Sequence, residues 1–89
     1  MRARATKRFR RCFEALPQHV RDRARRAFTL WRADPGHPSL RFKRVHTTHR
    51  VYSVRVGRGW RALCVVEDEE AVWFWIGSHA DYDRLIAEL

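Results

Sequence analysis

The fold is decided by residues 51–78, VYSVRVGRGWRALCVVEDEEAVWFWIGS, where strand-like patterns follow one another at short intervals. Apolar and polar residues alternate with a period of two in the first two patterns, and the third is apolar throughout. A continuous apolar run is typical of a strand that is covered on both faces. Gly57-Arg58-Gly59 and the acidic run 67–70 supply the turns. The stretch therefore predicts three antiparallel strands, at 52–56, 60–66 and 71–76.

Upstream of this stretch the apolar residues change to helical spacing. They recur three and four residues apart over 5–15 and again over 20–31, which predicts two amphipathic helices. Pro17 ends the first helix, and Asp34-Pro35-Gly36 ends the second. Because helical patterning begins so early, no strand is predicted ahead of the first helix. A short alternation at 40–43 predicts a further strand.

The C-terminal segment has the pattern of one more short helix. Ser78 and Asp81 are spaced like a helix-start capping pair. An apolar stripe follows, made of Tyr82, Leu85, Ile86 and Leu89. The order of elements favours the α+β class, with an N-terminal helical hairpin packed on a small antiparallel sheet of three or four strands, in a single domain over residues 1–89. The covered face of the sheet is predicted to hold Leu40, Phe42, Tyr52, Val54, Val56, Ala62, Cys64 and Val66.

The charge of the chain is high and unevenly distributed. The formal net charge is +9. Residues 1–61 contain eighteen Lys and Arg against three acids, whereas residues 62–89 contain one against seven. Such a basic surface indicates a polyanionic partner, which is a nucleic acid, an acidic protein or an anionic membrane. A codon bias toward arginine is the alternative explanation for part of the excess.

The two cysteines and the N-terminus indicate the compartment. Cys12 and Cys64 are far apart and lack CxxC spacing, so we expect buried, reduced thiols rather than a disulfide. The N-terminus has no apolar run of signal-peptide length, and no stretch has the length of a membrane span. We expect a cytoplasmic protein without membrane attachment. No metal-ligand spacing is present, so neither a metal nor another cofactor is expected.

Arginine and lysine residues are predicted on the uncovered face of the sheet. This face should hold Arg41, Lys43, Ser53, Arg55 and Arg61. If the turn has three residues, Arg55 lies directly opposite Arg61, and like charges in that arrangement are unfavourable unless an anion lies between them. Two alternatives remain: the side chains diverge into water, or a two-residue turn breaks the pairing.

His79 is the candidate acid or base. It directly follows the buried strand and Gly77, so it should be presented at the sheet edge. Histidine is the natural proton-transfer group near neutral pH. Next to arginines it could help the ribose 2′-OH of RNA attack the adjacent phosphate. The simpler interpretation is a polar residue at a helix start. His49, in a loop with His46, is either solvated or a substrate contact.

Several segments together resemble RelE/ParE-type toxins of type II toxin–antitoxin systems. The resemblance runs over nearly the whole chain. It is carried by ALP at 15–17, DP at 34–35, HPSL at 37–40, YSVRV at 52–56, WRAL at 60–63 and WFWIGSHADYD at 73–83. It implies the RelE-like α+β fold, and many members of this superfamily are ribosome-dependent mRNA endonucleases that cleave without a metal.

The resemblance also implies roles for individual residues. His79 stands where the YafQ branch has a catalytic histidine, and Tyr82 where other branches use a tyrosine. Arg55 and Arg61 correspond to strand arginines that hold the phosphate. Trp75 stands where some relatives have a further arginine, so that phosphate ligand is absent here. Further RNA-binding candidates are Lys43, Arg41, His49 and Trp60, although alternation places Trp60 on the covered face, where packing is the competing role.

The predicted function is that of a toxin that cleaves mRNA on the ribosome and inhibits translation. The implied partners are a cognate antitoxin, mRNA and the ribosome. The free toxin should be a monomer that forms a hetero-oligomer with the antitoxin, whose acidic amphipathic segment would cover the basic surface. Two alternatives are a ParE-like toxin that inhibits DNA gyrase by protein binding, and a non-catalytic nucleic-acid-binding module or decayed toxin. A pure binder would not need His79, Arg55 and Arg61 together.

Overall fold

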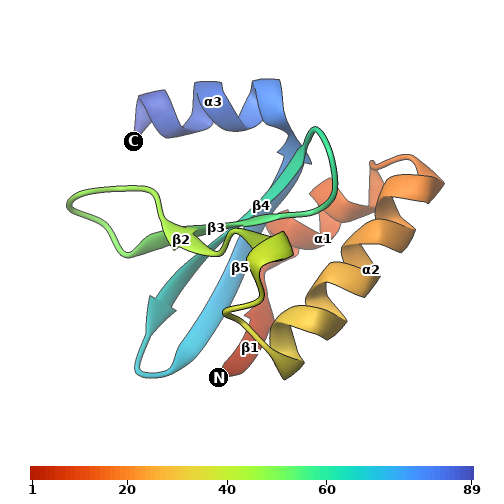
Figure 1. The fold of residues 1–89 in the computed structure, drawn as a ribbon. Helices are drawn as coiled ribbons and strands as arrows, with labels where there is room; N and C mark the ends of the chain where they lie inside the picture. The colour runs from red at the N-terminus through yellow and green to blue at the C-terminus, as the bar shows by residue number, and fades with distance from the viewer.

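The three strand patterns of residues 51–78 form the centre of a five-stranded sheet. The computed structural model describes all 89 residues and shows three α-helices and one 3-10 turn around this sheet (Figure 1). The elements are β1 (Arg2–Ala5), α1 (Lys7–Glu14), α2 (Gln18–Ala33), η1 (Pro38–Leu40), β2 (Lys43–Arg44), β3 (Val51–Arg55), β4 (Trp60–Glu67), β5 (Glu70–Ser78) and α3 (His79–Glu88). The strand order is β1-β5-β4-β3-β2, and only the β1–β5 pair is parallel.

The prediction that no strand precedes the first helix was wrong. Residues 2–5 form the edge strand β1, which pairs in parallel with β5 so that Ala3 lies beside Ala71. Alternating arginine and alanine is a weak strand signal, and the stability of this strand comes from a partner almost seventy residues away. The first helix begins later than predicted because the Thr6 Oγ1 accepts a hydrogen bond from the Phe9 N–H at 3.1 Å and caps it.

The strand predicted at 40–43 is mostly replaced by η1. The His37 Nδ1 accepts the Ser39 N–H at 3.2 Å, and Pro38 supplies the fixed φ of a helical first turn. Arg41 then adopts a left-handed conformation with φ 46°, which ends the turn. Only the two residues of β2 remain to pair with β3. The alternation of apolar residues was correct, but it reports burial of Leu40 and Phe42 rather than an extended backbone.

The sheet is covered on both faces. All eight residues predicted for the covered face belong to the core beneath α1 and α2 or pack against it. On the other face, α3 lies over a smaller cluster of Val51, Leu63 and Trp75 (Figure 1). A bulge in the β4–β5 pairing, where Leu63 and Cys64 oppose Trp75 and Trp73, leaves Phe74 without a partner. Because β5 contributes residues to the apolar clusters on both faces of the sheet, it is apolar throughout, as predicted.

The larger core is rich in aromatic rings. Trp31 packs edge-on against Trp73 at 5.2 Å between ring centroids, and Phe28 does so at 4.9 Å. Such contacts add about 0.5–1.5 kcal/mol per pair beyond the burial of area. Only 18 of the 89 residues are buried, so these rings carry much of the stability of a small domain. None of the helices has both the length and the apolar character needed to cross a membrane.

Candidate functional site

His79 lies at the junction between β5 and α3, where the backbone is held from two sides. Its N–H donates to the Gly59 carbonyl at 2.8 Å, which ties the start of α3 to the turn between β3 and β4. The Ser78 Oγ accepts the Asp81 N–H at 3.2 Å, so the predicted capping pair is confirmed. Hydrogen bonds from Arg84 and Ser78 lower the pKa of Asp81, which keeps its carboxylate charged beside the helix N-terminus. The His79 side chain is half exposed.

Replacing Ser78 by alanine should destabilise the protein by about 1 kcal/mol, because the cap of α3 is lost. The start of α3 should fray, and His79 should then lose its fixed position. Urea unfolding would measure the stability, and amide exchange would show whether the loss is local to residues 79–82. Ser39→Ala is the matched control. Equal protection of α3 in both variants would contradict this positioning role.

Two neighbours of His79 come from the next turn of α3. The His79 Nε2 lies 3.6 Å from the Asp83 Oδ2, and the Tyr82 ring lies 5.6 Å from the imidazole, centroid to centroid. A carboxylate at this distance from a histidine can orient the imidazole ring. The sequence-based reasoning missed Asp83, although its spacing of four residues from His79 on a predicted helix was the available signal.

Arg61 reaches the same place from β4. Its guanidinium carbon lies 5.7 Å from the centroid of the Tyr82 ring, so both the arginine and the histidine are neighbours of the tyrosine. One guanidinium nitrogen of Arg61 is buried and has no hydrogen-bond partner. A buried donor without a partner costs about 1–3 kcal/mol, which an anionic ligand could offset.

The register of the hairpin places Arg55 directly across from Arg61, as predicted. The Val56 N–H donates to the Trp60 carbonyl at 3.0 Å, which closes the three-residue turn and removes the alternative of a two-residue one. On its other side Arg61 pairs with Gly77, the residue two before His79. The structure therefore gathers His79, Tyr82, Arg61 and Arg55 at one end of β3, β4 and β5. We call these four residues the His79 cluster.

Trp75 lies beside this cluster and presents an aromatic ring to it. A Cβ built on Gly77 would be 2.5 Å from Cζ2 of the Trp75 ring, so the ring lies across the glycine backbone. Trp75 is buried with Val51 and Leu63. Trp75 therefore contributes packing, and the positive charge at this end of the sheet comes from Arg55 and Arg61.

The remaining predicted residues lie outside the cluster. Lys43 pairs with Ser53, which is two residues from Arg55, so it borders the His79 cluster. Arg41 is exposed in the left-handed turn ahead of β2. Trp60 is half-buried against the core under α1 and α2, on the opposite face from Arg61. His49 stacks on His46, whose Nε2 lies 3.1 Å from the Leu89 carbonyl at the far end of α3, about 15 Å along the helix.

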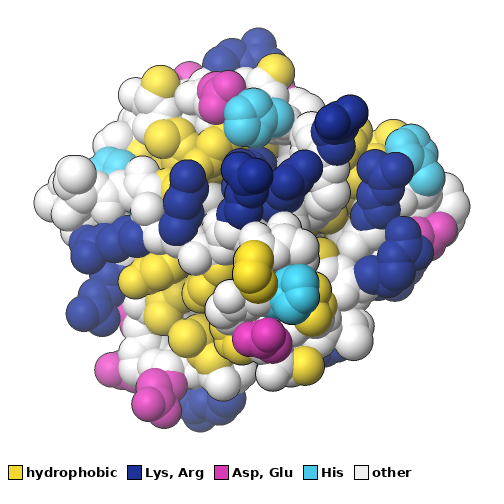
Figure 2. All heavy atoms as spheres, viewed as in Figure 1, with side chains coloured by type: hydrophobic (Ala, Val, Ile, Leu, Met, Phe, Trp, Pro, Cys, Tyr) yellow, Lys and Arg dark blue, Asp and Glu magenta, His cyan; other side chains and the backbone are white.

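Lys and Arg side chains gather on one face of the molecule. Figure 2 shows Lys and Arg side chains in a band across the middle of this face, between α3 and η1, that continues onto α2 at the right. Acidic side chains lie mainly toward the edges of the same face (Figure 2). Such a band attracts a polyanion and guides it toward the cluster.

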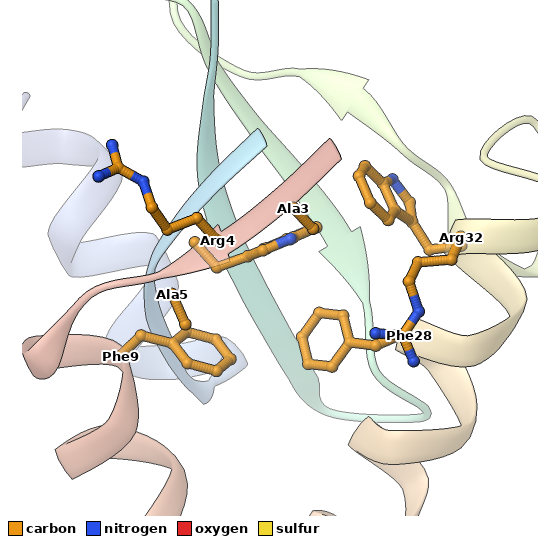
Figure 3. A pocket seen from close by; sticks show the side chains of 8 residues that line it. Ala3, Arg4, Ala5, Phe9, Phe28 and Arg32 are labelled. Atoms are coloured by element: carbon orange, nitrogen blue, oxygen red, sulfur yellow. The ribbon is translucent and has the colours of Figure 1, made fainter. Parts of the chain in front are cut away.

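A separate cavity of about 200 Å³ lies between β1, α1 and α2. Its walls are the rings of Phe9, Phe28, Trp31 and Trp73, with small β1 side chains above them. Figure 3 shows Phe9 and Phe28 pointing into the same space and the Arg4 guanidinium pointing away from it. The lining offers no carboxylate, histidine or nucleophile, so this cavity has no part in the chemistry of the His79 cluster.

The two cysteines offer no nucleophile to the site. Burial raises the pKa of the Cys64 thiol to about 12, so it stays protonated. Cys12, which was expected to be buried, is only partly so. No group of three His, Cys, Asp or Glu side chains converges closely enough to hold a metal ion.

Comparison with known proteins identifies the family. The sequence profile described as the ParE-like toxin domain matches residues 18–84. The chain belongs to this family. No sequence among the curated proteins is significantly similar to this toxin.

Solved structures show that the toxin has the RelE-like fold. RelE in the RelB–RelE antitoxin–toxin complex from Methanococcus jannaschii has a TM-score of 0.73 at 19% identity, covering 91% of this chain and 96% of that one. YafQ from E. coli strain BL21(DE3) has 0.74 at 11%, covering 92% and 98%. The isolated E. coli RelE toxin has 0.66 at 15%, covering 99% and 98%. The toxin is thus a member of the RelE/ParE superfamily, with five strands rather than the three or four predicted.

Proposed function

We propose that this toxin is a ribosome-dependent mRNA endonuclease that inhibits translation in the cytoplasm. The supporting observation is the His79 cluster, in which a histidine and a tyrosine from α3 and two arginines from β3 and β4 lie together at one end of the sheet. This set provides a proton acceptor, a proton donor and cations, which are the groups that cleavage of a ribose phosphodiester requires.

The proposed step uses the 2′-OH of the RNA as the nucleophile. The His79 imidazole takes the proton of this hydroxyl, and the oxygen forms a bond to the adjacent phosphorus. The bond from phosphorus to the 5′-oxygen breaks, which leaves a 2′,3′-cyclic phosphate, and the departing oxygen takes a proton from Tyr82. Arg61 and Arg55 bind the non-bridging oxygens, where charge grows in the transition state. Asp83 orients the imidazole. The reaction consumes no cofactor.

A cognate antitoxin would silence this activity. Several structures similar to this toxin are antitoxin–toxin complexes, including those from Methanococcus jannaschii and Pyrococcus horikoshii. An acidic, amphipathic segment would complement the basic band and cover the His79 cluster. In this proposal the free toxin is a monomer, and the silent form is a hetero-oligomer with the antitoxin.

Inhibition of DNA gyrase is the second candidate function, because the matching family is named after ParE. A toxin of that type would act by protein binding alone. It would have no use for a histidine held between a carboxylate and a tyrosine at 5.6 Å. The geometry of the His79 cluster therefore favours cleavage over simple binding.

Purified toxin, translating ribosomes and a reporter mRNA would test the proposal directly. We expect new 5′-hydroxyl ends and 2′,3′-cyclic phosphates at cut sites within the reading frame. A single 2′-deoxyribose placed at a mapped cut site should abolish that cut and leave the others, because it removes the nucleophile. Intact mRNA together with inhibited supercoiling by gyrase would overturn the proposal and establish the second candidate.

A further inference from the structure

A basic cleft of about 450 Å³ lies between α2, η1 and the end of β3, next to the His79 cluster, with which it shares Arg55. Its arginines are Arg23 and Arg26 from α2 and Arg55 from β3. We propose that this cleft binds the phosphodiester backbone of single-stranded RNA next to the bond that is cut. The inference rests on the proposed function for the identity of the strand, and it adds two binding residues that the sequence-based reasoning did not single out.

The arginines of the cleft carry uncompensated charge. None of the ion pairs of the molecule involves Arg23, Arg26 or Arg55. No acidic residue lines the cleft. By contrast, Arg25 on the same helix pairs with Asp22 at 3.3 Å. Planar guanidinium groups that converge without a carboxylate are suited to bind phosphate oxygens, often with two hydrogen bonds each.

The backbone around the cleft lets the arginine side chains approach one another closely. Arg23 and Arg26 are one helical turn apart, so their Cβ atoms are about 5–6 Å apart on one face of α2. Gly57 faces them with φ +79°, and a Cβ at this position would lie only 3.1 Å from the Cδ of Arg23. Glycine therefore serves two needs here, the left-handed turn and the close approach of the arginine stem.

The floor of the cleft indicates which part of a nucleic acid it would hold. Its apolar lining consists of Ala27, Leu30 and Leu40, and no aromatic ring is present. Proteins that hold single-stranded bases stack them on aromatic side chains. A cleft with arginines but without rings therefore fits the sugar–phosphate backbone and should bind independently of sequence.

Arg55 connects the cleft to the His79 cluster. It lines the cleft and also lies opposite Arg61 in the hairpin. Because β2 pairs only with Tyr52 and Ser53, β3 is itself the edge of the sheet at Arg55. The band of positive charge in Figure 2 runs from the sheet onto α2 without an acidic interruption. A strand whose scissile phosphate lies between Arg55 and Arg61 would place its next phosphates at Arg26 and Arg23.

The test compares two double variants that each remove two charges. Arg23→Gln/Arg26→Gln changes the cleft, and Arg10→Gln/Arg32→Gln removes exposed arginines of α1 and α2 outside it. Binding of a short 2′-O-methyl single-stranded RNA, which cannot be cleaved, would be measured by fluorescence anisotropy at several salt concentrations. Thermal unfolding would show that both variants are folded.

The cleft variant should show a weaker dependence on salt than the wild type. Each phosphate contact contributes about 0.7 to the slope of log affinity against log salt for single strands, so two lost contacts reduce it by about 1.4. The ratio of wild-type to variant affinity should therefore fall about sevenfold between 50 and 200 mM salt. The control variant should keep a slope close to that of the wild type.

Equal slopes for the two double variants would overturn the inference. Unchanged binding of the oligonucleotide combined with weaker binding to empty ribosomes would also overturn it, since the arginines would then contact ribosomal RNA instead of the substrate strand. Neither result depends on cleavage. A wild-type toxin that binds the oligonucleotide through the cleft but cuts no mRNA would instead contradict the proposed function alone.

Discussion

Replacing His79 by alanine is expected to lower the rate of mRNA cleavage by about 10²–10⁴-fold, the usual contribution of a general acid or base. The imidazole is the only group in the His79 cluster that can take a proton from the 2′-OH near neutral pH. Because the side chain is half exposed, the fold should remain intact. Single-turnover cleavage on translating ribosomes would measure the rate, and growth of an induced bacterial host would report toxicity.

A matched control is His19→Ala, which removes an exposed histidine from α2. This variant should arrest growth and cut mRNA like the wild type. If the His79→Ala variant is expressed, arrests growth and produces the same mRNA cut sites as the wild-type toxin, the histidine has no role in cleavage. Asp83→Asn should have a smaller effect, because Asp83 acts only by orienting the ring from 3.6 Å away.

The central part of the fold could be predicted because its residues alternate. Each apolar position of β3 and β4 that was assigned to the covered face lies there, since a period of two determines which side chains share a face. The two elements that could not be predicted from the sequence were β1 and η1. β1 is stabilised by a partner strand far along the chain, and η1 by a histidine side chain and a proline, so neither depends on local alternation.

In the candidate site, too, features that depend on local pattern could be predicted, and features that depend on tertiary packing could not. The pairing of Arg55 with Arg61 could be predicted because a three-residue turn determines the register of a hairpin. The position of Tyr82 over Arg61 depends on how α3 packs on the sheet, and only the resemblance to the family pointed to it. The basic cleft depends on the position of α2 relative to the end of β3, which no periodicity in the sequence specifies.

Arg61→Met is expected to reduce cleavage by about 10²–10³-fold and, unlike most core-edge substitutions, to stabilise the protein by about 1 kcal/mol. Methionine keeps the unbranched stem of the side chain but ends near the position of the Arg61 Nε, so the guanidinium that lies near the Tyr82 ring is lost. It removes a buried nitrogen that has no partner and a positive charge directly opposite Arg55. Urea unfolding would measure the stability, and the same single-turnover assay the rate.

A bound anion would give the buried Arg61 nitrogen a partner and reduce the repulsion between Arg55 and Arg61. Inorganic phosphate should therefore stabilise the wild-type toxin more than Arg61→Met at matched ionic strength, because only the wild type can bind the anion between two arginines. Arg84→Met, which removes an exposed arginine paired with Asp81, is the control for a general effect of charge. Two results would show that Arg61 serves the fold and not phosphate binding: a less stable Arg61→Met variant, or equal stabilisation of both proteins by phosphate. Residues that are selected for binding often lower the stability of the fold, so their replacement should not destabilise it.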